Sequence, residues 1–139
     1  YLNKISGPLL DRIDLHVEVT PVPFSELSSS NSTEPSSNVR ERVLKARDIQ
    51  AKRFEAHEGV YCNAQMGSKL LKEICVINTL GQNLLKTAMD RLNLSARAYD
   101  RILKVSRTIA DLGDSEEIRP EHLAEAIQYR SLDREGWAG

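Results

Sequence analysis

The stretch Leu92–Leu112, LNLSARAYDRILKVSRTIADL, predicts a long amphipathic helix. Ser95 is its expected N-cap, because a serine hydroxyl can accept a hydrogen bond from the free amides of a first turn. Gly113 is its expected end. Apolar and small side chains recur at the spacing of one helix face, which indicates packing against a core. These inward residues are Tyr99, Ile102, Leu103, Ser106, Ile109 and Ala110.

The opposite face of this helix is basic. At about 100° per residue, Arg97, Arg101 and Lys104 lie within roughly 60° of one another. Arg97 falls in the first turn, where a cation opposes the helix dipole at a cost of about 0.3–1 kcal/mol. An anion bound there would meet both the helix amides and the arginine. A solvated basic face, eased by Asp100, is the alternative interpretation.

Four further helices are predicted around this one. Each has apolar residues at helical spacing, and Pro120 suits a first helical turn. Asn38 is the expected N-cap of the first, whose expected inward residues are Val39, Val43, Ala46 and Phe54. Together the helices predict a mainly α protein, a helical bundle of about one hundred residues. The predicted ranges are 38–55, 68–76, 79–92 and 120–132.

The N-terminal residues 1–24 carry a different pattern. From Ile13 to Val19 apolar and polar residues alternate, which predicts a strand that Pro21 and Pro23 end. A lone strand needs a sheet, and no second strand is predicted downstream. We therefore expect an orphan strand, with residues 1–38 mobile or loosely packed on the helices. The chain also starts without Met, which indicates a piece of a larger protein.

Residues 25–38, SELSSSNSTEPSSN, predict a flexible linker, because so polar a stretch cannot offset its ordering entropy. The predicted division is therefore 1–24, a linker at 25–38, and a helical domain at 39–139.

Composition narrows the function classes. The 139 residues hold 19 Lys and Arg against 20 Asp and Glu, so the chain is not a uniformly basic nucleic-acid binder. No apolar run is long enough to span a membrane, and no secretory signal is present. Cys62 and Cys75 suit a reduced, cytoplasmic protein without a disulfide, and no metal site is expected. No phosphate-binding loop and no hydrolase or metalloprotease motif occurs, so a self-contained catalytic site is not expected.

Four segments resemble, in order, the C-terminal part of magnesium chelatase-like AAA+ ATPases of the competence and branch-migration type. The resemblance covers nearly the whole chain except the Ser-rich linker. The segments are SGPLLDRIDLH at 6–16, YCNAQM at 61–66, Leu92–Leu112, and IRPEHLAEAIQYR at 118–130.

The resemblance implies roles for two arginines. Arg12 matches the arginine finger that acts on the nucleotide of a neighbouring subunit. Arg97 matches the sensor 2 arginine at the start of a lid helix, which touches the γ-phosphate of its own subunit's nucleotide. Both roles need a permanently charged planar fork beside developing phosphate charge. The resemblance further implies ATP and Mg²⁺, a homo-hexameric ring and a DNA-remodelling role for the whole protein.

The phosphate loop, the Walker B acid and sensor 1 of that family are absent from this sequence and are expected upstream. We therefore expect the chain alone, without that AAA+ core, neither to hydrolyse ATP nor to bind it tightly. Two other readings stay open: a protein-interaction module, and a stand-alone helical DNA-binding module that uses Arg97, Arg101, Lys104 and Arg107.

Overall fold

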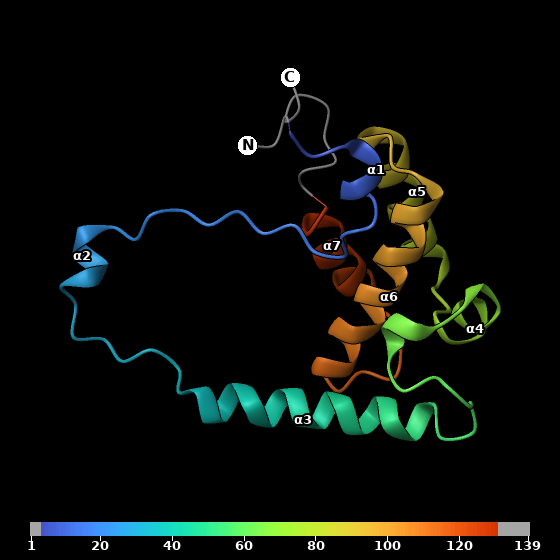
Figure 1. Cartoon of the computed structure of the whole chain (residues 1–139), viewed down its shortest axis with the longest axis horizontal. Coiled ribbons are helices and arrows are strands. Elements are labelled where there is room, and N and C mark those ends of the chain that lie inside the picture. The colour runs from blue at the N-terminus through green and yellow to red at the C-terminus, as the bar shows by residue number, and fades with distance from the viewer. Residues whose placement is uncertain (1–3, 131–139) are drawn as a thin grey trace.

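Helix α6, Ala96–Leu112, lies at the centre of the computed structural model, which describes residues 4–130 (Figure 1). The long helix α3 crosses one end of α6, and α7 packs along it. Helix α5 packs on α7, and the short α4 and η2 lie against α6. The bounds are α3 Ser36–Arg53, η2 Asn63–Gln65, α4 Ser68–Ile74, α5 Thr79–Leu92 and α7 Pro120–Gln128.

The ends of α5 and α6 follow from their capping residues. The Ser95 side chain accepts a hydrogen bond from the Ala98 amide, as predicted, and Gly113 follows the last residue of α6. Asn78 caps α5 in the same way, through the amide of Gly81. Asn93 ends α5 in a left-handed conformation, with φ of 48°. Short polar side chains at these positions fix the bounds of both helices.

The core is one cluster of apolar side chains, mainly from α4, α5, α6 and α7 and from residues that directly follow α3 and η2. The mainly α prediction and its helical bundle are therefore confirmed. The buried members are Phe54, Met66, Leu71, Cys75, Leu85, Ile102, Leu103, Ala110, Ile118, Leu123 and Ala126.

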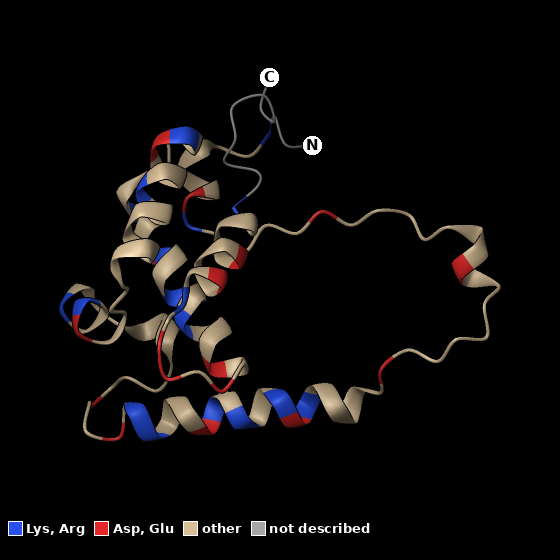
Figure 2. Ribbon diagram, turned by 180° about the vertical axis from the view of Figure 1, so that it is seen from behind, with Lys and Arg blue, Asp and Glu red and all other residues tan. Residues whose placement is uncertain are grey.

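Some predicted inward positions are wrong. Tyr99 is 40% exposed, and Val39 and Val43 are also exposed. The N-terminal half of α3 extends past the bundle, so its apolar residues are only partly covered. Charges of both signs line the helix (Figure 2). Helix α3 starts at Ser36 after Pro35, and Asn38 is not its cap.

The last helix is shorter than predicted. Helix α7 ends at Gln128, and the predicted end at 132 lies outside the described residues. At its start, the Arg119 amide donates to Nδ1 of His122, which takes the place of the N3 glutamate of a capping box.

The strand predicted for Ile13–Val19 is not formed. Its residues are irregular, because no neighbouring strand among the described residues offers a ladder of hydrogen bonds. The strand-like pairing described is a single parallel bridge between Ile77 and Ile118. The segment instead follows a one-turn helix, α1 Gly7–Leu10, and docks on the bundle through a buried His16.

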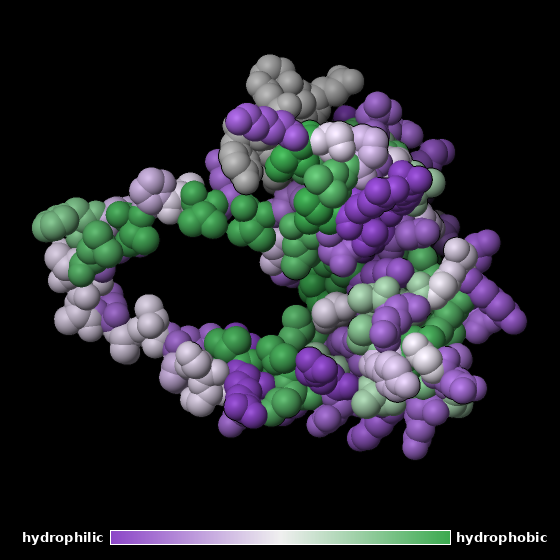
Figure 3. All heavy atoms as spheres, viewed as in Figure 1, coloured by the Kyte–Doolittle hydropathy of each residue, from purple (hydrophilic) through white to green (hydrophobic). Residues whose placement is uncertain are grey.

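Residues 17–35 form a loop that stands away from the bundle (Figure 1). All of them are exposed, and residues 28–35 have no regular structure. Helix α3 begins at Ser36, inside the range 25–38 predicted as a linker. A four-residue helix, α2 Phe24–Leu27, interrupts the loop. Exposed apolar side chains dot this loop (Figure 3). They are Val17, Val19, Val22, Phe24 and Leu27.

Candidate functional site

Arg97 occupies the second position of α6, directly after the Ser95 cap and Ala96. Its side chain is exposed and makes no hydrogen bond or ion pair with the residues that the structure describes. A guanidinium beside the free amides of a helix start suits a negatively charged group. The position predicted for phosphate contact is therefore open to solvent.

Arg12 lies in the tight turn that follows α1. Its amide donates to the Leu9 carbonyl at 3.1 Å, and the next amide, of Ile13, donates to Leu10 at 3.1 Å. The Arg12 side chain is exposed and has no partner among residues 4–130. The turn thus fixes the backbone and leaves the guanidinium projecting from the surface.

Arg101 connects α6 to the Arg12 turn. Its Nε donates to the Asp11 carbonyl at 3.0 Å, and its Nη1 forms an ion pair with the Asp14 carboxylate. Arg101, a predicted nucleic-acid contact, therefore binds the N-terminal arm of its own chain, residues 4–16. The sequence showed Asp14 beside Arg12 but gave no signal that Arg101 would reach it.

Arg130 holds the same turn from the other side, and the sequence gave no signal for this role. Its side chain is almost fully buried and donates to the carbonyls of Ile13 and Leu10. Nε2 of His16 also faces the Leu10 carbonyl at 3.3 Å, and the His16 amide donates to the Tyr129 carbonyl at 2.7 Å. The arm is therefore docked by polar contacts to backbone carbonyls.

Lys104 and Arg107, the other predicted nucleic-acid residues, also have partners within the chain. Lys104 Nζ donates to the Ala64 carbonyl of η2 at 3.1 Å. Arg107 is buried, and its Nη1 and Nη2 donate to the carbonyls of Glu116 and Ser115 at 2.8 and 2.6 Å. In this geometry Arg107 offers no face to a nucleic acid, and its role is structural.

A buried ionic cluster surrounds Asp111. The carboxylate, with its side chain 0% exposed, accepts from both ends of the Arg53 guanidinium at 2.5 and 2.7 Å. It also accepts from Arg107 Nε at 3.2 Å and from the side-chain nitrogen Nδ2 of Asn63 at 2.9 Å. Burial is the main cause that lowers the pKa of Arg107. The cluster ties α3 and η2 to α6.

No catalytic or metal centre is evident among residues 4–130. They contain no group of His, Cys, Asp and Glu that could hold a metal ion. Cys62 and Cys75 are free thiols, and burial raises the pKa of Cys75 to about 11, which makes it a poor nucleophile. Across the same described range, no helix is both long and apolar enough to cross a membrane.

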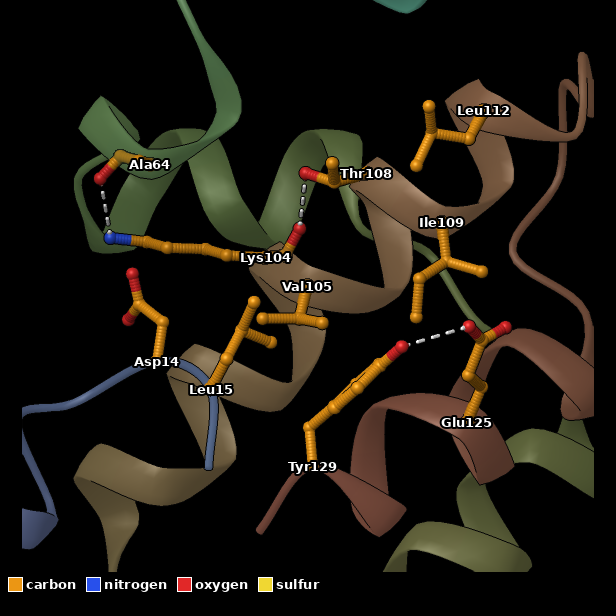
Figure 4. Close-up of a pocket in the computed structure, with 10 residues that line it drawn as sticks. All are labelled: Asp14, Leu15, Ala64, Lys104, Val105, Thr108, Ile109, Leu112, Glu125 and Tyr129. Carbon is orange, nitrogen blue, oxygen red and sulfur yellow. Dashed lines mark hydrogen bonds between the residues drawn. The ribbon is translucent and has the colours of Figure 1, made fainter. Parts of the chain in front are cut away.

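An apolar cavity of about 300 Å³ lies between the arm, α6 and α7 (Figure 4). Leu15, Val105 and Ile109 form its wall, and Lys104, Asp14 and Glu125 stand at its polar edge. The Tyr129 hydroxyl donates to Glu125 at 3.4 Å. This hydroxyl–carboxylate contact is long and exposed to solvent, so the exposed arginines remain the candidate functional groups.

The chain matches two family models in sequence order. Residues 33–130 match "Magnesium chelatase, subunit ChlI C-terminal", and residues 1–27 match "Magnesium chelatase, subunit ChlI". The first match covers more than half of the chain. The chain belongs to the magnesium chelatase ChlI family. This confirms the resemblance inferred from residues 6–16 and 92–112.

This ChlI-family chain is similar to curated proteins that are much longer than it is. It is 46% identical over 135 residues to "Competence protein ComM" of Haemophilus influenzae, and 40% identical over 135 residues to "Uncharacterized protein YifB" of Escherichia coli. Each alignment covers 96% of this chain and 26% of the relative. The chain thus spans about a quarter of the length of these relatives.

Proposed function

We propose that the chain is the lid portion of a magnesium chelatase-like AAA+ ATPase that couples ATP binding and hydrolysis to motion of a ring. In this proposal residues 1–24 end the nucleotide-binding core, 25–38 link it to the lid, and 39–139 form the lid. Membership in the ChlI family and the helical fold of residues 36–128 support the lid assignment.

The observation that carries the proposal is the state of Arg97. It is exposed in the first turn of α6 and has no partner among the described residues. By contrast, Arg101 and Arg107, on the same helix, are bound within the chain. In the proposal Arg97 acts as sensor 2 and contacts the γ-phosphate of ATP bound by its own subunit.

Arg12 supplies the second phosphate contact in the proposal, as an arginine finger on the nucleotide of the next subunit. This requires a closed ring, and a homo-hexamer is the proposed assembly. An arginine finger is worth a factor of about 10³–10⁵ in phosphoryl transfer. The exposed guanidinium on a fixed backbone turn supports this role.

ATP and Mg²⁺ would therefore be held mainly by the rest of the complete protein. The present sequence has no phosphate-binding loop, and the described residues have no metal-ligand cluster, so it contributes contacts rather than a whole site. In the proposal the complete ring acts on DNA in recombination or transformation. Arg101 and Lys104 are occupied within the chain, so a stand-alone DNA-binding module is the weaker candidate.

The test is the ATPase rate of the complete protein that carries this chain. Arg97→Ala should lower ATP affinity and kcat/KM by at least about tenfold, as expected for a lost charge-assisted contact to phosphate. Arg12→Ala should lower kcat by about 10³-fold or more.

Arg91→Ala is the matched control. Arg91 is an exposed arginine near the end of α5, a few residues before Arg97, with no hydrogen bond or ion pair to the described residues. Its loss should leave the ATPase unchanged. Equal rates for Arg97→Ala, Arg91→Ala and the parent protein would refute the sensor role.

A further inference from the structure

We infer that Arg101 and Arg130 are positioning residues for Arg12, and that Arg101 ties the Arg12 turn to the helix that carries Arg97. This inference rests on the proposed function, because it assumes that Arg12 acts on a nucleotide. The observation behind it is that the two arginines bind the backbone on both sides of Arg12.

The carbonyl that precedes Arg12 belongs to Asp11, and it accepts from Arg101 Nε at 3.0 Å. One residue after Arg12, the carbonyl of Ile13 accepts from Arg130 Nη1. Two guanidinium groups therefore hold the peptide unit directly before Arg12 and the second peptide unit after it. We call these contacts of Arg101 and Arg130 the clamp. The clamp fixes the position of the Arg12 Cα atom, while the exposed Arg12 side chain can still extend outward.

The clamp has further points of attachment. Arg101 also pairs with the Asp14 carboxylate, so one guanidinium spans the turn from Asp11 to Asp14. Arg130 Nη2 donates to the Leu10 carbonyl at 3.4 Å, which Nε2 of His16 also approaches. Because guanidinium has several donors in a rigid fork, such bonds restrict orientation as well as distance.

The two halves of the clamp come from different parts of the bundle. Arg101 lies on α6 four residues after Arg97, which is about one helical turn. Arg130 follows the end of α7, which packs along α6. A shift of α6 caused by phosphate at Arg97 would therefore pull on the Asp11 carbonyl. Nucleotide bound by one subunit would therefore change the orientation of Arg12 in that subunit. In the proposed ring, this Arg12 contacts the nucleotide of the neighbouring subunit.

The alternative is that the ion pair between Arg101 and Asp14 only stabilises the fold. Arg101 keeps a side chain about one-third exposed, and Asp14 is exposed to about half, so the pair adds little to stability. The contact of Arg101 that solvent competes with least is the one to the backbone carbonyl. Its consequence is a fixed turn rather than a more stable core.

The test compares Arg12→Ala, Arg101→Gln and the double variant in the complete, ATP-hydrolysing protein. Arg101→Gln should lower kcat by about 10–100-fold, the size expected when a catalytic group is displaced by about 1 Å. KM for ATP should stay within about twofold, because the residue acts through Arg12 in the transition state. Arg101→Lys, which keeps the charge beside Asp14, should recover part of kcat.

The double variant separates positioning from a general effect on folding. If Arg101 acts through Arg12, then Arg12→Ala plus Arg101→Gln should be no slower than Arg12→Ala alone. Arg91→Gln, which removes an exposed arginine from α5, is the matched control and should leave kcat unchanged. Multiplicative losses in the double variant would overturn the positioning role while leaving the proposed function intact.

Hydrogen exchange of residues 10–16 in the same protein gives a second readout. Arg101→Gln should speed exchange there, above all at the His16 amide that donates to Tyr129. Exchange in α5 should not change, which would exclude global unfolding. Unchanged exchange in residues 10–16 would overturn the clamp. An unchanged ATPase for Arg12→Ala would refute the proposed function, and the positioning role with it.

Discussion

Two arginines on one helix, Arg97 and Arg107, have opposite surroundings. Arg97 lies in the first turn of α6, exposed and without a partner among residues 4–130. Arg107 lies ten residues later, with its side chain 5% exposed and donors bound to Asp111, Ser115 and Glu116. An arginine is thus exposed at the N-terminal end of α6, and another is buried near its C-terminal end.

The difference comes from what covers the helix, not from the helix itself. Helix α3 and η2 lie against the C-terminal half of α6 and bring Arg53 and Asn63 to Asp111. The N-terminal turn of α6 has no such cover at Arg97. Charge patterning along one helix therefore cannot tell a solvated arginine from a buried one, because the burial is decided by elements far away in the sequence.

The largest effect should come from removing the shared carboxylate. Asp111→Ala would leave Arg53 and Arg107 facing each other without their common acceptor, and it should cost about 3–5 kcal/mol of unfolding free energy. Urea denaturation followed by circular dichroism measures this. Asp90→Ala, at an exposed position of α5, is the matched control and should stay within about 0.5 kcal/mol. A loss below about 1 kcal/mol for Asp111→Ala would refute the buried cluster.

The next largest effect should be the difference in stability loss between Arg107→Ala and Arg97→Ala. Arg107→Ala should destabilise by about 2–3 kcal/mol, because it leaves the buried Asp111 carboxylate and two partly buried carbonyls with fewer donors. Arg97→Ala should change stability by no more than about 0.5 kcal/mol, and it can stabilise slightly by removing a cation from a helix start. Thermal unfolding of both variants under one buffer tests the contrast. Equal losses would break it.

The free energy of unfolding should also depend on pH through the buried thiol of Cys75. Burial holds the pKa of this thiol at about 11, above its ordinary value of 9.0, so the folded state keeps the proton longer than the unfolded state. The stabilising contribution is complete below pH 9 and is lost as the pH rises toward 11, by on the order of 2 kcal/mol. Unfolding free energies at pH 8 and 10.5 measure this loss.

The Cys75→Ala variant isolates the thiol from other groups that titrate at high pH. Its stability should fall less with pH than that of the parent chain. Cys62→Ala, which removes the partly exposed thiol, should keep the parent slope. Identical slopes for parent and Cys75→Ala would contradict the raised pKa.

The smallest effect on stability should come from the exposed N-terminal end of α6. Ser95→Ala removes the hydroxyl that accepts from the Ala98 amide at 3.1 Å, and it should cost about 1 kcal/mol. Ser95→Asp keeps an acceptor at the cap and should restore stability. Denaturant titrations of the two variants test this, and a Ser95→Ala variant as stable as the parent would show that the cap contributes nothing.

Local signals in the sequence were enough for the bounds of α5 and α6 and not for the arm. Ser95 and Gly113 mark the bounds of α6, and the bounds of α5 agree with its predicted range. The alternation from Ile13 to Val19 was misleading, because a strand depends on a partner that no local pattern supplies. The arm docks instead through Arg101 and Arg130, whose partners lie about ninety and more residues away.

In the candidate site, too, part of the prediction from the sequence agrees with the structure and part does not. The exposure of Arg12 and Arg97 is compatible with the roles that the family resemblance implies, and those roles stay predictions. The basic face was only partly foreseen. Spacing grouped Arg101 and Lys104 correctly on α6, but it could not show that the Asp11 and Ala64 carbonyls would occupy them.

The loop of residues 17–35 has one further consequence, for evolution. The arm and the bundle are held together by contacts on either side of this loop and not by the loop itself. Each doubling of such a loop costs only about 0.6 kcal/mol in closure entropy. Insertions and deletions between His16 and Ser36 should therefore accumulate among homologues with little penalty, while the turn around Arg12 keeps its length.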